Sequence, residues 1–133
     1  MGQPAAKKND KVVGVDTHVV MVPSPPGSPV PTPLPHPFSG KIDGELSSDV
    51  KINGKQAATV DSTVTNSPSH TPTPPGTSFQ STPANKGTVL TGSTTVKING
   101  KGAARSGDTV ETCNDPSDLP NGTIIAESTV SIG

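Results

Sequence analysis

Four side chains in this sequence are suited to binding a soft metal ion: His18, His36, His70 and Cys113. They are all of the histidines and the only cysteine in a chain of 133 residues. Structural zinc is four-coordinate and favours nitrogen and sulfur ligands from histidine and cysteine. If the four residues meet, the protein fills every coordination position and leaves none for a reacting water. They therefore predict a structural Zn2+ site, with no catalytic role for the metal.

A repeated segment indicates how such distant residues are brought together. Val-Lys-Ile-Asn-Gly occurs at residues 50–54 and 96–100, and both copies run on into Lys-x-Ala-Ala; Val-Ser-Ile-Gly at residues 130–133 is a weaker third copy. Alternating Val and Ile are typical of a strand with one buried face, and Asn-Gly is typical of a tight turn. Before each copy, a Gly-Lys-Ile, Gly-Thr-Val or Gly-Thr-Ile segment opens a first strand, and a polar bend reverses the chain. The pattern predicts three β-hairpin units, in residues 37–61, 83–108 and 120–133.

The third unit lacks the Gly-Lys-x-Ala-Ala segment that follows the other two. Residues 2–10, which read GQPAAKKND, supply a similar segment at the other end of the sequence. We therefore expect the N-terminal segment to lie beside the C-terminal strand. This pairing closes the three units into a ring of pseudo-threefold symmetry, whereas an open array leaves unpaired strand edges.

The predicted metal ligands occupy related places in these units. His18, His70 and Cys113 each follow an Ala-Ala segment, so three related loops that converge on one axis bring them together. His36 has no counterpart in this pattern. Asp16 or Asp115 is an alternative, either as a replacement ligand or as a residue that orients a ligand. Without the repeats, a lone histidine in a proline-rich loop is usually a surface residue, and a lone cysteine is usually a small buried hydrophobe.

The composition limits the chain to one small domain, residues 1–133, with little material for a core. It contains no Trp, no Tyr and only two Phe, together with 14 Gly and 16 Pro. A structural zinc site supplies roughly 10–16 kcal/mol of binding free energy to a small fold at neutral pH. A bound metal would therefore compensate for the shortage of large apolar side chains.

Charge and hydropathy exclude several classes of protein. The formal net charge is −1 and the basic residues are scattered, so nucleic acid is not a predicted partner. No run approaches the roughly 18 apolar residues of a membrane span. The N-terminal residues form no apolar signal region, so we expect synthesis in the cytoplasm without a signal peptide. One cysteine allows no internal disulfide.

Two proline-rich tracts, residues 22–38 and 67–83, contain or adjoin predicted ligands. Pro at this density excludes helix and favours extended polyproline II backbone. A flexible linker, or a ligand for a Pro-binding domain, is the alternative interpretation. We expect rigid loops that wrap the fold, since Pro lowers the entropy lost on ordering.

The Ala-Ala segments resemble a known family signature. GQPAA, GKQAA and GKGAARSGD are similar to degenerate copies of the Pro-Ala-Ala-Arg signature of PAAR-repeat proteins, and the Val-x-Ile-x-Gly strands before them extend the resemblance over nearly the whole chain. No copy spells the full tetrapeptide, because residues 4–6 lack the Arg and residues 103–105 lack the Pro. This departure is typical of a PAAR-like branch.

The resemblance implies a fold and a function. It implies an all-β, small cone-shaped fold of three pseudo-threefold β-hairpin repeats with long Pro-rich loops and a zinc near the tip. PAAR proteins cap the trimeric spike of contractile injection systems, such as type VI secretion systems and phage-tail-like particles. The base of the cone binds a VgrG-like or tail spike protein, as a monomer on a homotrimer, and three quasi-equal units avoid a symmetry mismatch there. The point faces the target membrane.

This resemblance also implies location and partners. We expect a non-enzymatic spike tip that sharpens the spike for membrane puncture and effector delivery, with effector proteins and, transiently, the target-cell membrane as further partners. It would be incorporated into the injection particle and delivered outside the cell or into target cells on firing. The alternatives are a small zinc-dependent hydrolase or effector, or a Pro-rich interaction linker. No HExxH-like segment or Ser-His-Asp spacing supports a hydrolase.

Overall fold

The computed structural model describes residues 2–133, and every regular element in that range is a β-strand. This confirms the predicted all-β class. The strands are β1 (Gln3–Pro4), β2 (Lys11–Val22), β3 (Val30–Gly44), β4 (Lys51–Ile52), β5 (Lys55–Gln56), β6 (Thr63–Asn66), β7 (Ser78–Phe79), β8 (Lys86–Val89), β9 (Lys97–Ile98), β10 (Lys101–Gly102), β11 (Thr109–Thr112), β12 (Leu119–Ile125) and β13 (Ser131–Ile132). The described residues include no helix long and apolar enough to cross a membrane.

The main sheet closes on itself. Its strands run in the order β12-β11-β8-β6-β3-β2, all neighbours are antiparallel, and β12 pairs back with β2. The short β7 adds to β2 beside the ring. Alternate side chains point into the closed sheet and form the main core: Val12, Phe38, Ile42, Val64, Val89, Val110 and Ile124. The expected Gly-Lys-Ile, Gly-Thr-Val and Gly-Thr-Ile strands lie here, in β3, β8 and β12.

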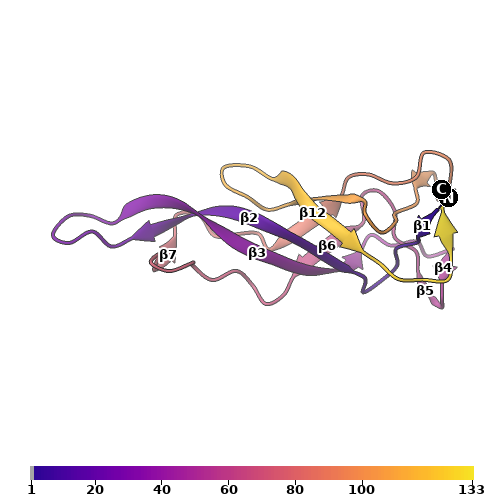
Figure 1. Cartoon of the computed structure of the whole chain (residues 1–133), viewed down its shortest axis with the longest axis horizontal. Helices are drawn as coiled ribbons and strands as arrows, with labels where there is room; N and C mark the ends of the chain where they lie inside the picture. Colours follow the sequence, from indigo (N-terminus) through magenta and orange to yellow (C-terminus); the bar gives the residue numbers. More distant parts are fainter. Residues whose placement is uncertain (1) are drawn as a thin grey trace.

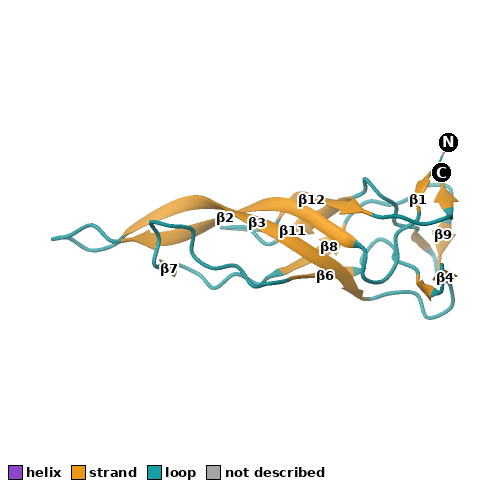
Figure 2. Cartoon of the chain, turned by 60° about the horizontal axis from the view of Figure 1, so that its bottom comes forward, coloured by secondary structure: helices purple, strands orange, loops and turns teal. Residues whose placement is uncertain are grey.

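Three two-stranded antiparallel pairs lie at the wide end of the molecule (Figures 1 and 2). They are β4–β5, β9–β10 and β13–β1. In the third pair Gln3 lies opposite Ile132, which confirms that the N-terminal segment pairs with the C-terminal strand. Here Figure 1 shows both ends of the chain side by side.

The pairing inside the units differs from the prediction. Val-Lys-Ile pairs with the segment just after it, not with the Gly-Lys-Ile or Gly-Thr-Val strand across the polar bend. The two-residue turns explain this, because Asn53 and Gly54 have φ angles of 49° and 81°, and Asn99 and Gly100 have 52° and 81°. Consecutive positive φ angles match a type I′ hairpin turn, which joins the strands directly on either side of it.

The Ala-Ala segments meet in a triangle of backbone hydrogen bonds. The N–H of Ala6 donates to Ala104 O at 2.9 Å, that of Ala104 donates to Ala58 O at 3.0 Å, and that of Ala58 donates to Ala6 O at 3.0 Å. All three side chains are fully buried, as are those of the alanines just before them. Backbones that approach this closely leave room for little more than a methyl group, which explains the choice of alanine.

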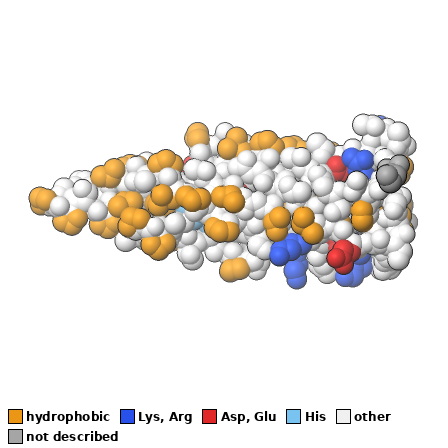
Figure 3. Space-filling model, in the orientation of Figure 1, with side chains coloured by type: hydrophobic (Ala, Val, Ile, Leu, Met, Phe, Trp, Pro, Cys, Tyr) orange, Lys and Arg blue, Asp and Glu red, His pale blue; other side chains and the backbone are white. Residues whose placement is uncertain are grey.

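The molecule is elongated and tapers from the hairpins toward the β2–β3 hairpin (Figures 1 and 3). Residues 30–38 were expected to form a polyproline II loop but belong to β3. Prolines at alternate positions make this possible. The prolines of β3 lie opposite Thr17, Val19 and Met21 of β2. The backbone N–H and C=O groups of these three residues form hydrogen bonds with other segments, on the side of β2 that faces away from β3. The proline positions are thus non-hydrogen-bonded pairs, where a missing N–H costs the ladder nothing.

Candidate metal centre

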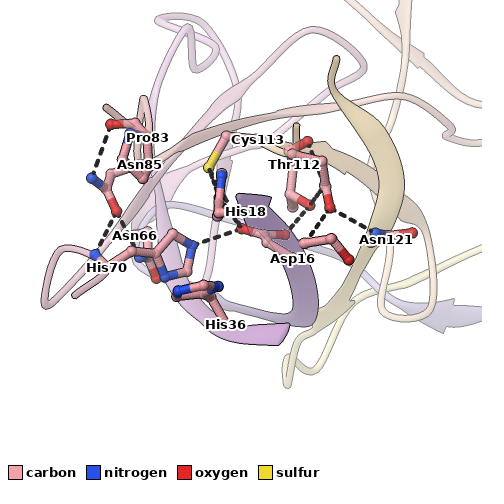
Figure 4. A network of polar contacts seen from close by, with 12 residues as sticks. Asp16, His18, His36, Asn66, His70, Pro83, Asn85, Thr112, Cys113 and Asn121 are labelled. Atoms are coloured by element: carbon pink, nitrogen blue, oxygen red, sulfur yellow. Dashed lines mark hydrogen bonds and ion pairs between the residues drawn. The ribbon is translucent and has the colours of Figure 1, made fainter. Parts of the chain in front are cut away.

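Four side chains from three parts of the chain meet inside the narrowing part of the fold (Figure 4). Asp16 and His18 lie two residues apart on β2, so the strand period places them on the same buried face. Cys113 follows directly after β11, and His70 lies in the segment between β6 and β7. One ligand atom from each lies within 4.8 Å of all the others.

The separations fit a single small ion. Cys113 Sγ lies 3.7 Å from His18 Nε2 and 3.5 Å from Asp16 Oδ2. His70 Nε2 lies 2.8 Å from Asp16 Oδ2, and His18 Nε2 lies 4.0 Å from it. Tetrahedral zinc with its usual bond lengths separates ligand atoms by about 3.3–3.8 Å. The two separations of Cys113 fall within that range, whereas His70 lies closer to Asp16 and His18 lies farther from it, so the side chains would have to move to enclose a zinc ion.

Asp16 and Cys113 make this site electrostatically unusual. Asp16 is fully buried, and in the described part of the chain its carboxylate contacts Thr112, Cys113 and two histidines but no Lys or Arg. Burial, reinforced by the charge of Asp16, raises the pKa of the Cys113 thiol to about 11. A buried anion without a cationic partner is costly. A divalent ion would balance one carboxylate and one thiolate, and it would deprotonate the thiol outright.

His36, the fourth predicted ligand, lies against the cluster but outside the group of four atoms. Its ring is buried, with its centroid 5.4 Å from that of His18 and 5.6 Å from that of His70. Its Nε2 accepts a hydrogen bond from the Thr73 N–H at 3.1 Å, so Nδ1 carries the proton and donates to Leu34 O at 2.9 Å. The structure brings together three of the four predicted ligands and adds Asp16, the alternative that the sequence offered.

Burial lowers the pKa of His36, with the Leu34 carbonyl opposing and the two neighbouring histidines reinforcing this effect. The neutral ring is also what the hydrogen bond from Thr73 requires. His36 therefore holds the Thr73 segment against β3. Its neutral ring packs beside the cluster without adding charge to it.

Polar groups around the cluster position its members. Asp115 Oδ2 accepts a hydrogen bond from the Val19 N–H at 2.9 Å and lies 3.5 Å from His18 Nδ1. His18 Nδ1 is buried and makes no hydrogen bond with the described residues. A proton on Nδ1, directed at Asp115, leaves Nε2 free to bind a metal. The sequence offered Asp115 for such an orienting role.

Asn85 was not singled out from the sequence, yet it fixes His70. Its Oδ1 accepts hydrogen bonds from the His70 N–H at 2.8 Å and from Asn66 Nδ2 at 3.0 Å (Figure 4). Asn85 has a φ of 57°, a conformation that Asn tolerates better than most residues. An Asn in a loop carries no distinctive signal in the sequence, so only the structure assigns this role.

A cleft of about 370 Å³ leads to the cluster from outside. His36 and His70 line it together with the segment 66–69 and the prolines and threonines of 71–74. Of the four clustered residues, His70 alone lines this cleft.

Comparison with protein families gives one match, in the C-terminal part of the chain. The family model for the PAAR motif matches residues 80–133, which contain two of the three predicted units. The chain carries a PAAR motif. Searches of curated proteins and of solved structures gave no match. The match is consistent with a PAAR-repeat protein.

Proposed function

We propose that this PAAR protein caps the trimeric spike of a contractile injection system, with its wide end against a VgrG-like or tail spike protein. The triangle of hydrogen bonds among Ala6, Ala58 and Ala104 carries this proposal. A homotrimer presents three identical surfaces around its axis, and one chain contacts all three equally only if it has three corresponding sectors. The wide end has three such sectors, each formed by one two-stranded pair and the Ala-Ala segment beside it.

The contact surface that we propose contains Val50, Val96 and Val130. Each precedes one of the strands β4, β9 and β13, and they are 37%, 39% and 39% exposed. Partly exposed valines at three corresponding positions are suitable anchors for three equivalent apolar contacts. Beneath them, Ile52, Ile98 and Ile132 pack with three buried alanines into a second core, which makes this end rigid.

The test is co-purification with a trimeric spike protein from the same organism. Replacing all three valines by Asp should abolish binding, because desolvating three carboxylates against an apolar surface is costly. Val15→Asp is the matched control, since Val15 is 54% exposed on β2, away from the wide end. Unchanged binding of the triple variant, or equal loss in Val15→Asp, would refute the proposed surface.

We further propose a structural zinc ion held by His18, His70 and Cys113 with Asp16 as the fourth ligand. Asp16 and Cys113 supply the negative charge that the ion requires, and the ligand separations support zinc. In this role the protein is not an enzyme. The ion joins β2 to the segments that carry His70 and Cys113, and it stabilises a part of the fold too narrow for a large apolar core.

The narrow end is the part that we propose punctures a target membrane during effector delivery, outside the producing cell. Residues 19–40 contain no Lys, Arg, Asp or Glu, and neither do residues 66–85. Figure 3 shows no basic side chain on the visible face of the narrow half. A point without charged groups lowers the cost of passing through the hydrocarbon interior of a bilayer.

A further inference from the structure

The Asn-Gly dipeptide occurs three times in the chain, and two of the copies stand in identical sequence. Asn53 and Asn99 are each the fourth residue of Val-Lys-Ile-Asn-Gly-Lys, and each begins a two-residue turn in which the Asn and the Gly both have positive φ. The third copy, Asn121 and Gly122, lies inside strand β12. Any difference in the chemistry of Asn53 and Asn99 therefore comes from the tertiary structure.

Asn-Gly is prone to lose ammonia, because the glycine has no side chain to shield its backbone nitrogen. That nitrogen gives up its proton, attacks the side-chain carbon Cγ of the Asn and displaces Nδ2 as ammonia, which leaves a five-membered succinimide ring. Water then opens the ring at either carbonyl and produces Asp or isoaspartate. Among the described residues, no hydrogen bond occupies the N–H of Gly54 or Gly100, and open space lies beside both glycines.

The surroundings of Gly54 are positively charged. Gly54 lines a groove of about 400 Å³ together with Lys8, Lys51 and Lys55, and no acidic residue of the described chain lines this groove. All three lysines are exposed, and none forms an ion pair within 4 Å with a described residue. Deprotonation of the glycine nitrogen and attack on Cγ both develop negative charge, which nearby cations stabilise.

The second turn lies beside a carboxylate instead. Asn99 Nδ2 donates a hydrogen bond to Asp49 Oδ2 at 2.6 Å, and Asn99 Oδ1 accepts one from the Ser47 hydroxyl at 2.6 Å. A hydrogen bond to an ionised group is roughly twice as strong as a neutral one, so the Asn99 amide is firmly held. The charge of Asp49 also opposes the negative charge that the reaction develops.

We propose that Asn53 is a site of spontaneous deamidation and that Asp49 protects Asn99 from the same reaction. The described contacts of the Asn53 amide are two neutral, exposed hydrogen bonds with Thr129, of 2.8 and 3.1 Å. Asn121 should react most slowly, because Gly122 is paired with a strand on each side and its backbone is held extended. The proposal is independent of the capping function.

Conversion of Asn53 would loosen the wide end. The contact with Thr129 joins the β4–β5 pair to the segment just before β13, and so links two of the three sectors. Isoaspartate adds one atom to the backbone of a turn that places Ile52 directly opposite Lys55. The longer turn no longer fits this pairing, so both the β4–β5 pair and the link to Thr129 should weaken.

The test follows the purified full chain over time in mildly alkaline, low-salt buffer. Chymotrypsin cleaves after Phe and Leu, so mass spectrometry finds the three Asn-Gly pairs in separate peptides, residues 47–79, 91–119 and 120–133. Asn53 should convert about fivefold faster than Asn99, the effect of one nearby unit charge at an exposed site. In concentrated urea the two should convert at the same rate, because their sequence neighbours are identical. Equal rates in the folded chain, or a faster Asn99, would overturn the proposal.

Two variants test the assigned cause. Asp49→Asn keeps a hydrogen-bonding partner for Asn99 but removes its charge, and it should raise the rate at Asn99 toward that at Asn53. Lys8→Gln lies far from both turns in the sequence and should slow Asn53 while leaving Asn99 unchanged. A slow Asn99 in the Asp49 variant, or an equal effect of Lys8→Gln on both turns, would contradict the electrostatic explanation.

The effect on the fold is measured on the converted protein itself. Isoaspartate-containing chains, separated by ion exchange, should melt at a lower temperature than the parent chain. Asn53→Asp introduces the same charge without lengthening the backbone and should melt close to the parent. An isoaspartate form that melts like the parent would show that this turn does not hold the sectors together.

Discussion

His70 Nε2 lies 2.8 Å from Asp16 Oδ2, although 54 positions separate the two residues. The contact joins the segment between β6 and β7 to the buried face of β2, next to His18 and Cys113. In the proposed site, Asp16 takes the position of the fourth ligand that His36 was predicted to supply. It also compensates the charge of a divalent ion in a way that a neutral imidazole does not.

Asp16 and His36 can be distinguished as ligands by substitution. Asp16→Asn should lower the affinity for zinc by about 10–100-fold or more, the range typical of damage to a metal site. His36→Gln should keep one zinc per chain, with a lower melting temperature because the Thr73 segment is loosened. Competition with a chromophoric zinc chelator measures both affinities. Loss of zinc from His36→Gln with retention in Asp16→Asn would show that the fourth ligand is His36.

Cys113→Ser should lose zinc and stability together. The thiolate is both a ligand and half of the negative charge at the cluster, so its removal destroys the site. A loss of about 3 kcal/mol lowers the melting temperature of a chain of this length by roughly 10 °C. A chelator should lower the melting temperature of the parent chain but not that of Cys113→Ser. A parent chain that is folded and free of metal by elemental analysis would contradict the zinc proposal.

The stability of the metal-free chain should depend on pH through Cys113. Its pKa is raised to about 11 by burial, whereas an unfolded thiol ionises near pH 8.5. From about pH 8.5 to 11 the unfolded chain releases a proton that the folded chain retains, so stability falls as the pH rises. With zinc bound, the folded thiol is already ionised, and stability should instead rise with pH up to about 8.5.

Urea unfolding in a series of buffers, with and without zinc, measures both slopes. Metal-free Cys113→Ser is the control, because its alkaline slope reports all other groups. An equal slope in the control and the parent chain would show that the thiol is not buried in the folded state.

The three Ala-Ala segments should respond alike to overpacking. Ala6→Val, Ala58→Val and Ala104→Val each add two methyl groups where backbones meet, and each should cost about 1–3 kcal/mol in unfolding free energy. Ala84→Val, at an exposed position, should be nearly neutral. Chemical unfolding of the four variants measures this. One tolerant position among the three would mean that the sectors are not equivalent.

Much of this fold follows from local sequence. Asn53 and Gly54 specify a two-residue turn, alternating Val and Ile specify the short strands, and the resemblance of residues 2–10 to the Lys-x-Ala-Ala segments predicts that the chain ends pair. Each of these patterns involves only a few neighbouring residues. It therefore predicts the same local structure whichever distant segments pack against the strand.

The features that the sequence did not reveal depend on distant partners. Prolines at 31, 33, 35 and 37 read as a loop, because a strand tolerates them only where its outer edge has no partner. Asp16 was recognised only as an alternative ligand, although its spacing from His18 places both on one face of a strand. That spacing becomes informative once residues 11–22 are known to form one strand.

The most direct test of the capping function is the mass of the complex formed with the spike protein. Native mass spectrometry of the co-purified complex should give one copy of this chain for each spike trimer, since three sectors in one chain satisfy three subunits. Three copies per trimer, or no complex at all, would contradict the account.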